Sequence, residues 1–155
     1  MSFQISGLKV AEFAALRELS DAELAARGAR RVTADHYPGF PCRVSLVDAQ
    51  PGERLLLVNY EHQPADGPYR SRHAIYVREN ATDAVLAVNE IPPVLRIRLL
   101  SLRAFSTAGE LLDADVTAGD ALPGTIERML ADPRVAYLHV HNAKPGCYAA
   151  RIERA

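Results

Sequence analysis

The clearest alternation of apolar and polar side chains lies at the C-terminal end of the chain, in Val135–Arg154. Two alternating runs flank a Lys-Pro-Gly turn sequence at positions 144–146, so this stretch predicts a β-hairpin. In a strand, residues two apart point to the same face. His139 and His141 are therefore expected to project together, and Leu138 and Val140 to take the opposite face.

The register of this hairpin decides which side chains accompany the two histidines. If the loop has three residues and Gly146 is left-handed, the apolar residues of both strands share one face. His139, His141, Cys147 and Arg151 then share the other face as a polar cluster. A two-residue loop would break this match, so the predicted cluster depends on the register.

The rest of the chain has the pattern of strands joined by short turns, with few helices. Strands are predicted from alternating or apolar runs over Phe3–Ser6, Pro41–Val47, Arg54–Glu61, Tyr69–Arg78, Val94–Phe105 and Leu111–Thr117. Helices are predicted from spacing and capping residues over Lys9–Leu19, from Ser20 to Gly28, and from Asp120 to Leu130. Loops are predicted over Ala29–Pro41 and His62–Pro68, and the pair Pro92-Pro93 is predicted to exclude a helix.

Short turns between consecutive strands favour antiparallel pairing, and the pattern shows no strand–helix–strand series. The order therefore predicts an α+β fold, with a large, mainly antiparallel sheet, two short N-terminal helices and one helix before the C-terminal hairpin. A chain of 155 residues has the size of one domain, so we expect a single domain over residues 1–155.

Composition and charge narrow the classes of function. The net charge is −1 and the sequence shows no basic, aromatic-rich face, so we expect no binding to nucleic acid. The first residues lack the apolar core of an export signal, and no apolar run is long enough to cross a membrane. Two widely separated cysteines then indicate reduced thiols, and we expect a cytoplasmic protein with no membrane partner.

Of the 18 basic residues, 16 are arginine and only 2 are lysine. Codon bias accounts for such a composition, but the guanidinium fork also suits bidentate binding of carboxylate or phosphate. The sequence lacks a glycine-rich phosphate loop, a Gly-x-Ser-x-Gly elbow, a His-Glu-x-x-His motif and a dinucleotide fingerprint. Any chemistry is therefore expected to depend on separate Cys, His and Arg side chains.

Two interpretations centre on the cysteines and the C-terminal histidines. A His-x-His pair on a strand can present two imidazoles to one ion, and Cys147 and Cys42 would complete a tetrahedral zinc site with His139 and His141. Alternatively the cysteines are catalytic, because Cys42 precedes Arg43 and Cys147 is expected near His141, which suits a nucleophilic thiol. Both residue types also have plain packing roles, as buried inert thiols and as half-exposed, hydrogen-bonded histidines.

A third interpretation is a cleft for a small anion. Arg43, Arg72 and His73 would line it together with the C-terminal histidines. Asp35 and Glu53 would orient these groups or act as a general base. Against this interpretation, Arg72 can equally lie on a solvated strand face.

Three stretches of the chain carry a family resemblance. They are YPGFPCRVSLVDAQPGERLLLVNYEH, PYRSRHAIYVRE and LHVHNAKPGCYAARIERA, which place a Pro-Cys-Arg turn and a closing Gly-Cys-Tyr in order. These stretches resemble the bacterial family called domain of unknown function 1203 (DUF1203), and the resemblance covers nearly the whole chain. It implies a small, single-domain, cytosolic bacterial protein, and it supplies no catalytic residues.

The sequence leaves two classes of function. The first is a small-molecule binding protein or enzyme that holds an anionic metabolite in a Cys/His/Arg site, with arginines as anchors. The second is a non-catalytic module that acts through a protein partner, or through a homodimer formed along an exposed edge strand. In the second class the cysteines and histidines would be structural or would hold zinc. The reaction, the cofactor and the presence of a metal stay open.

Overall fold

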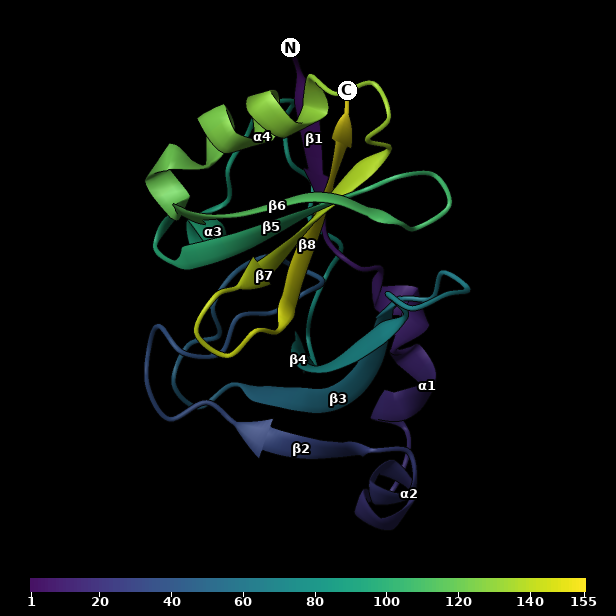
Figure 1. The fold of residues 1–155 in the computed structure, drawn as a ribbon. Helices are drawn as coiled ribbons and strands as arrows, with labels where there is room; N and C mark the ends of the chain where they lie inside the picture. The colour runs from purple at the N-terminus through teal and green to yellow at the C-terminus, as the bar shows by residue number, and fades with distance from the viewer.

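The computed structural model describes residues 1–155 and shows two antiparallel β-sheets, the larger above the smaller in Figure 1. The five-stranded sheet has the order β1-β8-β7-β5-β6, with β1 (Phe3–Ser6), β5 (Leu99–Phe105), β6 (Leu111–Ala118), β7 (Tyr137–Asn142) and β8 (Tyr148–Arg154). The three-stranded sheet has the order β2-β3-β4, with β2 (Ala29–Thr33), β3 (Arg54–Gln63) and β4 (Ser71–Arg78). The predicted α+β class is confirmed, with the strands divided between two sheets.

The helices are short and include two single 3₁₀ turns. They are η1 (Val10–Glu12), α1 (Ala14–Arg17), α2 (Asp21–Ala26), α3 (Pro93–Arg96), η2 (Gly119–Ala121) and α4 (Leu122–Leu130). α2 begins as predicted, because the Ser20 hydroxyl accepts a hydrogen bond from the Glu23 N–H and the Glu23 carboxylate accepts one from the Ser20 N–H. The single helix predicted over Lys9–Leu19 is instead η1 followed by α1. None of these helices has the length and apolar character that crossing a bilayer requires.

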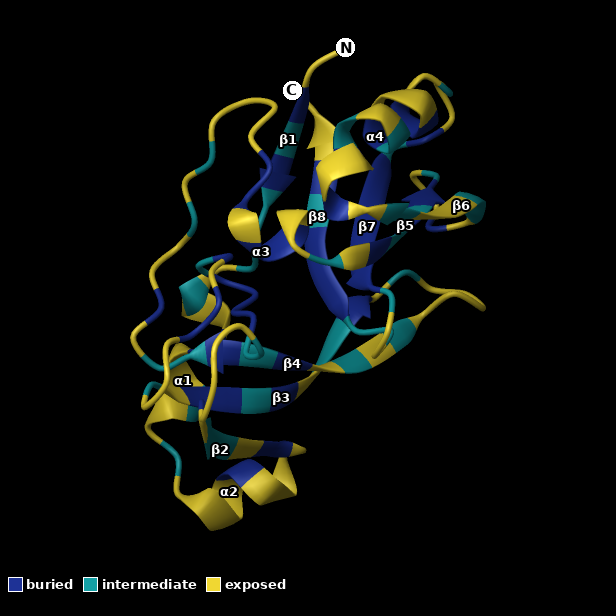
Figure 2. Cartoon of the chain, turned by 90° about the vertical axis from the view of Figure 1, so that its left-hand side faces the viewer, coloured by how far each residue is buried: buried dark blue, intermediate teal, exposed yellow.

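The larger hydrophobic core lies between the five-stranded sheet and α4, and β7, with all six residues buried, is the most deeply buried strand (Figure 2). Leu138 and Val140 of β7 are buried in this core, as their alternation predicts, and Ile126 and Met129 of α4 pack into it. A second core lies beside the three-stranded sheet and includes Leu56 of β3. Because Leu138 and Val140 occupy the core face of β7, the alternate residues of this strand point to its other face, toward the smaller sheet.

The loop predicted over Ala29–Pro41 is wrong for its first part. Residues 29–33 form β2, which pairs with β3 along its whole length. This strand shows little alternation in the sequence, because it is an edge strand with much of its outer side exposed to solvent. Pairing with β3, rather than the local pattern, therefore determines its conformation.

The strand predicted over Pro41–Val47 is also wrong. The segment is a compact turn, and only isolated bridges join Pro41 to Asp48 and Cys42 to Tyr76. The Cys42 N–H donates to the Val47 carbonyl at 2.9 Å, so the chain bonds to itself instead of to a neighbouring strand. The turn places Arg43, the residue after Cys42, between the two sheets.

The proline pair at 92–93 does not exclude a helix. α3 begins at Pro93, at a first-turn position where a backbone N–H has no intrahelical partner to lose. The strand predicted from Val94 therefore begins only at Leu99.

Gly7 follows β1 and allows a close contact with the turn that carries Arg43. A Cβ atom at this position would lie 2.6 Å from the Val44 carbonyl oxygen and 2.8 Å from that of Arg43, and the Leu8 N–H already donates to the Arg43 carbonyl. We expect Gly7→Ala to lower the free energy of unfolding by about 1–3 kcal/mol, because backbone atoms have to move apart. Urea unfolding measures this change.

Gly124 supplies the matched control, since it lies in α4 and a Cβ atom there would meet nothing within 4 Å. We expect Gly124→Ala to raise the free energy of unfolding by about 0.5–1 kcal/mol, because alanine has the higher helix propensity. If Gly7→Ala were as stable as the unmodified protein, the backbone contact beside Arg43 would have room for a Cβ atom at position 7, contrary to the prediction.

Candidate functional site

The central strand of the larger sheet carries the two histidines of the C-terminal hairpin. β7 lies between β8 and β5, and all six of its residues are buried. With Leu138 and Val140 in the core, His139 and His141 face the smaller sheet, and the ring centroids of His139 and His62 are 5.7 Å apart. The common orientation predicted for the two C-terminal histidines is confirmed.

His62 comes from β3, at a position predicted to lie in a loop. β3 continues to Gln63, whose amide exchanges hydrogen bonds of 2.8 and 3.1 Å with the Tyr137 hydroxyl of β7. This pair of bonds holds the end of β3 against β7. The His62 ring lies parallel to the rings of His73 and Tyr148, and its Nε2 is 2.9 Å from Nδ1 of His73.

Three buried imidazoles each have one ring nitrogen without a hydrogen-bond partner. These atoms are Nδ1 of His62, Nδ1 of His139 and Nε2 of His141. Nδ1 of His141 is 2.9 Å from the Gly146 carbonyl, so a neutral ring donates its proton there and leaves a lone pair on Nε2. In metal sites, such a bond from the second ring nitrogen is the usual device that orients a histidine ligand.

Ligand nitrogens of His62, His139 and His141 all lie within 4.8 Å of one another. In a tetrahedral zinc site with Zn–N bonds of about 2.0–2.1 Å, the nitrogens are about 3.4 Å apart. Sharing one ion therefore requires the imidazoles to approach by about 1.4 Å at most. A buried group of three imidazoles has the donor type that zinc, copper, nickel and iron accept.

Burial keeps these histidines neutral at pH 7. Desolvation is the main cause that lowers the pKa of His62 to about 4, and of His139 and His141 to about 3. Nearby positive charge acts in the same direction, with Arg103 contributing at all three rings. Burial also lowers the pKa of His73. A metal ligand has to be deprotonated, so the environment holds the imidazoles in the form that binds an ion.

A cavity of about 290 Å³ lies beside His62, which forms part of its wall. Arg103 and Arg70 line the same cavity. Arg70 is ion-paired with Glu61, whereas Arg103 is half-buried and burial alone lowers its pKa. The cavity therefore gives His62 a solvent-connected side that carries an uncompensated positive charge.

Cys147 does not share the face of the histidines. Val140 pairs with Ala150 but His141 pairs with Tyr148, so β8 has a bulge between these pairs. The bulge puts the Tyr148 side chain on the histidine face, and Cys147, one residue earlier, faces away from it. The Cys147 sulfur instead accepts hydrogen bonds from Asn142 Nδ2 at 3.6 Å and from Arg43 Nη2 at 2.9 Å.

The hairpin loop explains this difference from the predicted register. Gly146 is left-handed, with φ of 79°, as predicted. The Asn142 N–H, however, donates to the Cys147 carbonyl, so four residues rather than three separate the last bonded pair. Beyond the bulge His139 pairs with Arg151, so these two residues share a face as predicted. Of the four residues predicted to share the polar face, only Cys147 therefore lies on a different face.

The other sequence-based site residues are dispersed. Cys42 is 1% exposed, packs in the second hydrophobic core and accepts weak bonds from the Ser45 and Arg78 N–H groups. Arg72 is exposed and donates to Asn59.

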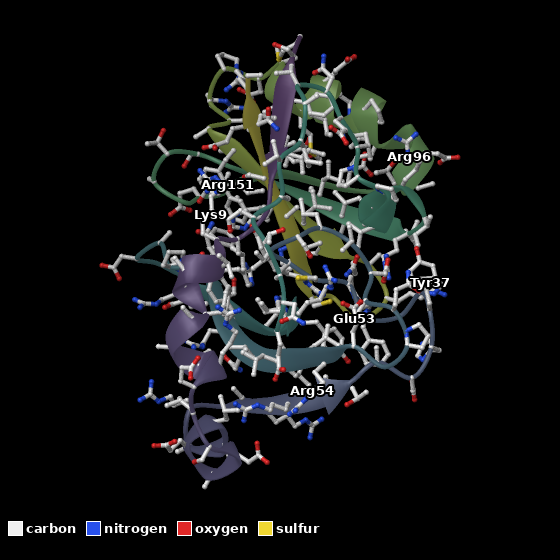
Figure 3. The ribbon with its side chains drawn as sticks, turned by 180° about the vertical axis from the view of Figure 1, so that it is seen from behind. Lys9, Tyr37, Glu53, Arg54, Arg96 and Arg151 are labelled. Carbon is white, nitrogen blue, oxygen red and sulfur yellow. The ribbon has the colours of Figure 1, made fainter.

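The two carboxylates of the anion-site hypothesis lie elsewhere. Asp35 is exposed and contacts the adjacent His36. Glu53 is ion-paired with Arg78 and lies well apart from Arg151 in Figure 3. The described contacts place neither carboxylate beside an imidazole of the buried group. His73, by contrast, is half-buried and packs against His62 and His141.

His62 is the residue that sequence reasoning missed. A signal was present, because His62 continues the alternation of Val58 and Tyr60 in β3. The prolines and glycine that follow favoured a loop instead, and a register shift between Tyr60 and Gln63 ends the regular pairing there. Nothing local indicates that this strand end packs against β7.

Comparison with known sequences gives one match. The model of a family described as "Protein of unknown function (DUF1203)" matches residues 39–154, which include His62, His73, His139 and His141 as well as Arg43 and Cys147. No curated protein and no solved structure matches the chain.

Proposed function

This chain belongs to the DUF1203 family, whose function is unknown, and we propose that it binds a divalent transition-metal ion, zinc above all, on His62, His139 and His141. The proposal keeps the two C-terminal histidines of the sequence-based zinc hypothesis. It replaces the cysteines by His62, because Cys147 faces away from the imidazoles and Cys42 lies in a hydrophobic core.

The observation that carries the proposal is a group of three histidines whose ligand nitrogens lie within 4.8 Å of one another, each ring also having a buried nitrogen without a partner. Leaving a buried polar atom unpaired costs about 1–3 kcal/mol, so three such atoms in one place are a large cost for a merely structural group. A shared ion removes this cost at all three atoms. The alternative, that the histidines only fill space, leaves the three unpaired nitrogens without an explanation.

Three protein ligands leave one coordination position open, and zinc sites of this kind are typically catalytic rather than structural. The cavity beside His62 offers room for a water molecule or a small ligand at that position. Arg103 in its wall favours a ligand that carries negative charge. The expected class of ligand is thus the small anionic molecule that the arginine-rich sequence suggests.

Metal content tests the proposal directly. Protein produced without a histidine tag, incubated with Zn²⁺ and passed through a desalting column, should retain about one zinc ion per chain by mass spectrometry. Co²⁺ in place of zinc should give the intense visible absorption of a tetrahedral site. A zinc content near zero, together with a melting temperature that Zn²⁺ does not change, would contradict the proposal, since an ion that binds the folded state stabilises it.

The expected homodimer stays a prediction. β6 is an edge strand of the larger sheet and exposes Val116, so it is the strand to examine first. Replacing Val116 by lysine should convert any dimer formed along this edge to monomer, as light scattering during gel filtration would measure.

A further inference from the structure

A second group of side chains surrounds the guanidinium of Arg43, which lies beside the start of β8. Arg43 is only 2% exposed, and no carboxylate is within ion-pair distance of it. Its N–H groups donate to the Tyr148 carbonyl at 2.7 Å, the Pro41 carbonyl at 2.5 Å and the Cys147 sulfur at 2.9 Å. Burial lowers the pKa of Arg43, the direction expected of a charge removed from water.

An uncompensated buried charge costs several kcal/mol, so buried arginines are normally paired with a carboxylate or another anion. The backbone carbonyls around Arg43 satisfy hydrogen bonds but carry no net charge. The Cys147 sulfur is the sole neighbour in this set that can become an anion. The positive charge of Arg43 is therefore not balanced by the groups that surround it, and a bound anion would balance it.

Arg43 lines the largest cavity of the molecule, which has a volume of about 430 Å³. Arg98 and Lys144 line it as well. Arg98 is neutralised by Asp48, to which it donates two hydrogen bonds of 2.6 and 2.9 Å. Lys144 is exposed and lies in the β7–β8 loop, with no acidic partner. Two positive charges without partners thus share one cavity.

Asn142 adds a polar group to the same wall. It is 6% exposed and its Oδ1 is buried without a hydrogen-bond partner, while its Nδ2 donates to the Cys147 sulfur at 3.6 Å. Turning the amide over would leave the NH₂ group without a partner instead. The turned-over orientation, with its NH₂ group free, is the one that can donate to an anionic oxygen.

We propose that this cavity binds a small anion through a carboxylate or phosphate group, held by Arg43 and Lys144, with the Cys147 thiol and the Asn142 amide beside it. The bound group supplies the charge that the guanidinium lacks, and the guanidinium offers N–H donors suited to either oxyanion. The proposal does not depend on a metal at His62, His139 and His141.

Cys147 allows the proposal to be tested by alkylation, because it is half-buried whereas Cys42 is fully buried. Iodoacetate and iodoacetamide transfer similar groups to sulfur, but only iodoacetate is an anion. Relative to the unfolded protein, we expect folded Cys147 to favour iodoacetate over iodoacetamide by about 10-fold, because a cationic cavity raises the local concentration of anions. Peptide mass spectrometry follows each cysteine separately.

Lys144→Gln should reduce this preference several-fold without affecting folding, since Lys144 is exposed. Lys9→Gln is the matched control, because Lys9 is the only other lysine of the chain and lies beside Asp83 rather than in the cavity wall. This control should retain the full preference. Raising the salt concentration should weaken the preference as well, because the charge on Lys144 is screened by solvent.

Protection by inorganic phosphate and by succinate distinguishes the two chemical classes. Protection of Cys147 by phosphate alone would assign a phosphate ligand, and protection by succinate alone a carboxylate ligand; protection by both would assign a general oxyanion site. Equal reactivity toward the two reagents, no protection by either anion, or no reaction of Cys147 at all would overturn the proposal. Metal-free protein should show the same reagent preference and the same protection of Cys147, because the anion site does not use the three histidines.

Discussion

Replacing His141 by alanine is expected to lower the affinity of the protein for Zn²⁺ by at least about 100-fold. Losing a group that merely orients a metal ligand costs 10–100-fold in affinity, and losing a ligand itself should cost more. His141 is 0% exposed and its free Nε2 is held by the bond from Nδ1 to the Gly146 carbonyl. Calorimetric titration of the metal-free protein with Zn²⁺ measures the change.

Two further variants make this result specific. His62→Ala should cause a comparable loss, although His62 belongs to the other sheet. His36→Ala should leave the affinity unchanged, because His36 is exposed and contacts Asp35 and Phe40 rather than the three histidines. Circular dichroism of each variant shows whether the fold is kept. Zinc affinity that falls equally in all three variants, or in none, would contradict the three-histidine centre.

Mild acid is expected to unfold the metal-free protein. In the unfolded chain the histidines take up protons near pH 6.5, whereas in the folded chain they stay neutral until about pH 4 for His62 and about pH 3 for His139 and His141. Between these values the unfolded state binds more protons, so stability is full above pH 6.5 and falls as the pH is lowered.

The size of the effect follows from the same shifts. Each histidine removes about 1.4 kcal/mol per pH unit, so three of them remove about 8 kcal/mol two units below pH 6.5. This loss is comparable with the whole stability of an ordinary domain, about 5–15 kcal/mol. We therefore expect a cooperative unfolding transition above about pH 4, before most carboxylates are protonated. Fluorescence or circular dichroism against pH measures it.

A double variant identifies the groups responsible. His139→Gln with His141→Gln removes two of the three titrating rings, and we expect the acid midpoint to move lower by about one pH unit or more. His36→Ala should leave the midpoint in place. Saturating Zn²⁺ should stabilise the protein at pH 7 and lose this effect in acid, because protonated imidazoles do not bind the ion. A free energy of unfolding that stays constant from pH 7 to pH 5 would contradict the prediction.

The local sequence determined the α+β class and much of the C-terminal hairpin. Alternation in β7 places Leu138 and Val140 in the core and turns His139 and His141 to the other side, as predicted. The cap of α2 at Ser20 is equally local, since it needs only side chains three residues apart. These predictions succeeded because side-chain direction within one element follows from backbone geometry alone.

The tertiary structure alone decided which residues meet across the two sheets. His62 joins His139 and His141 because β3 packs against β7, a contact between positions more than seventy residues apart that no local pattern encodes. One extra residue in β8 turns Cys147 from the histidines toward Arg43, and separates a single expected site into two. Strand pairing fixes where such a bulge lies, because the ladder of backbone hydrogen bonds, and not the side-chain alternation, sets the register.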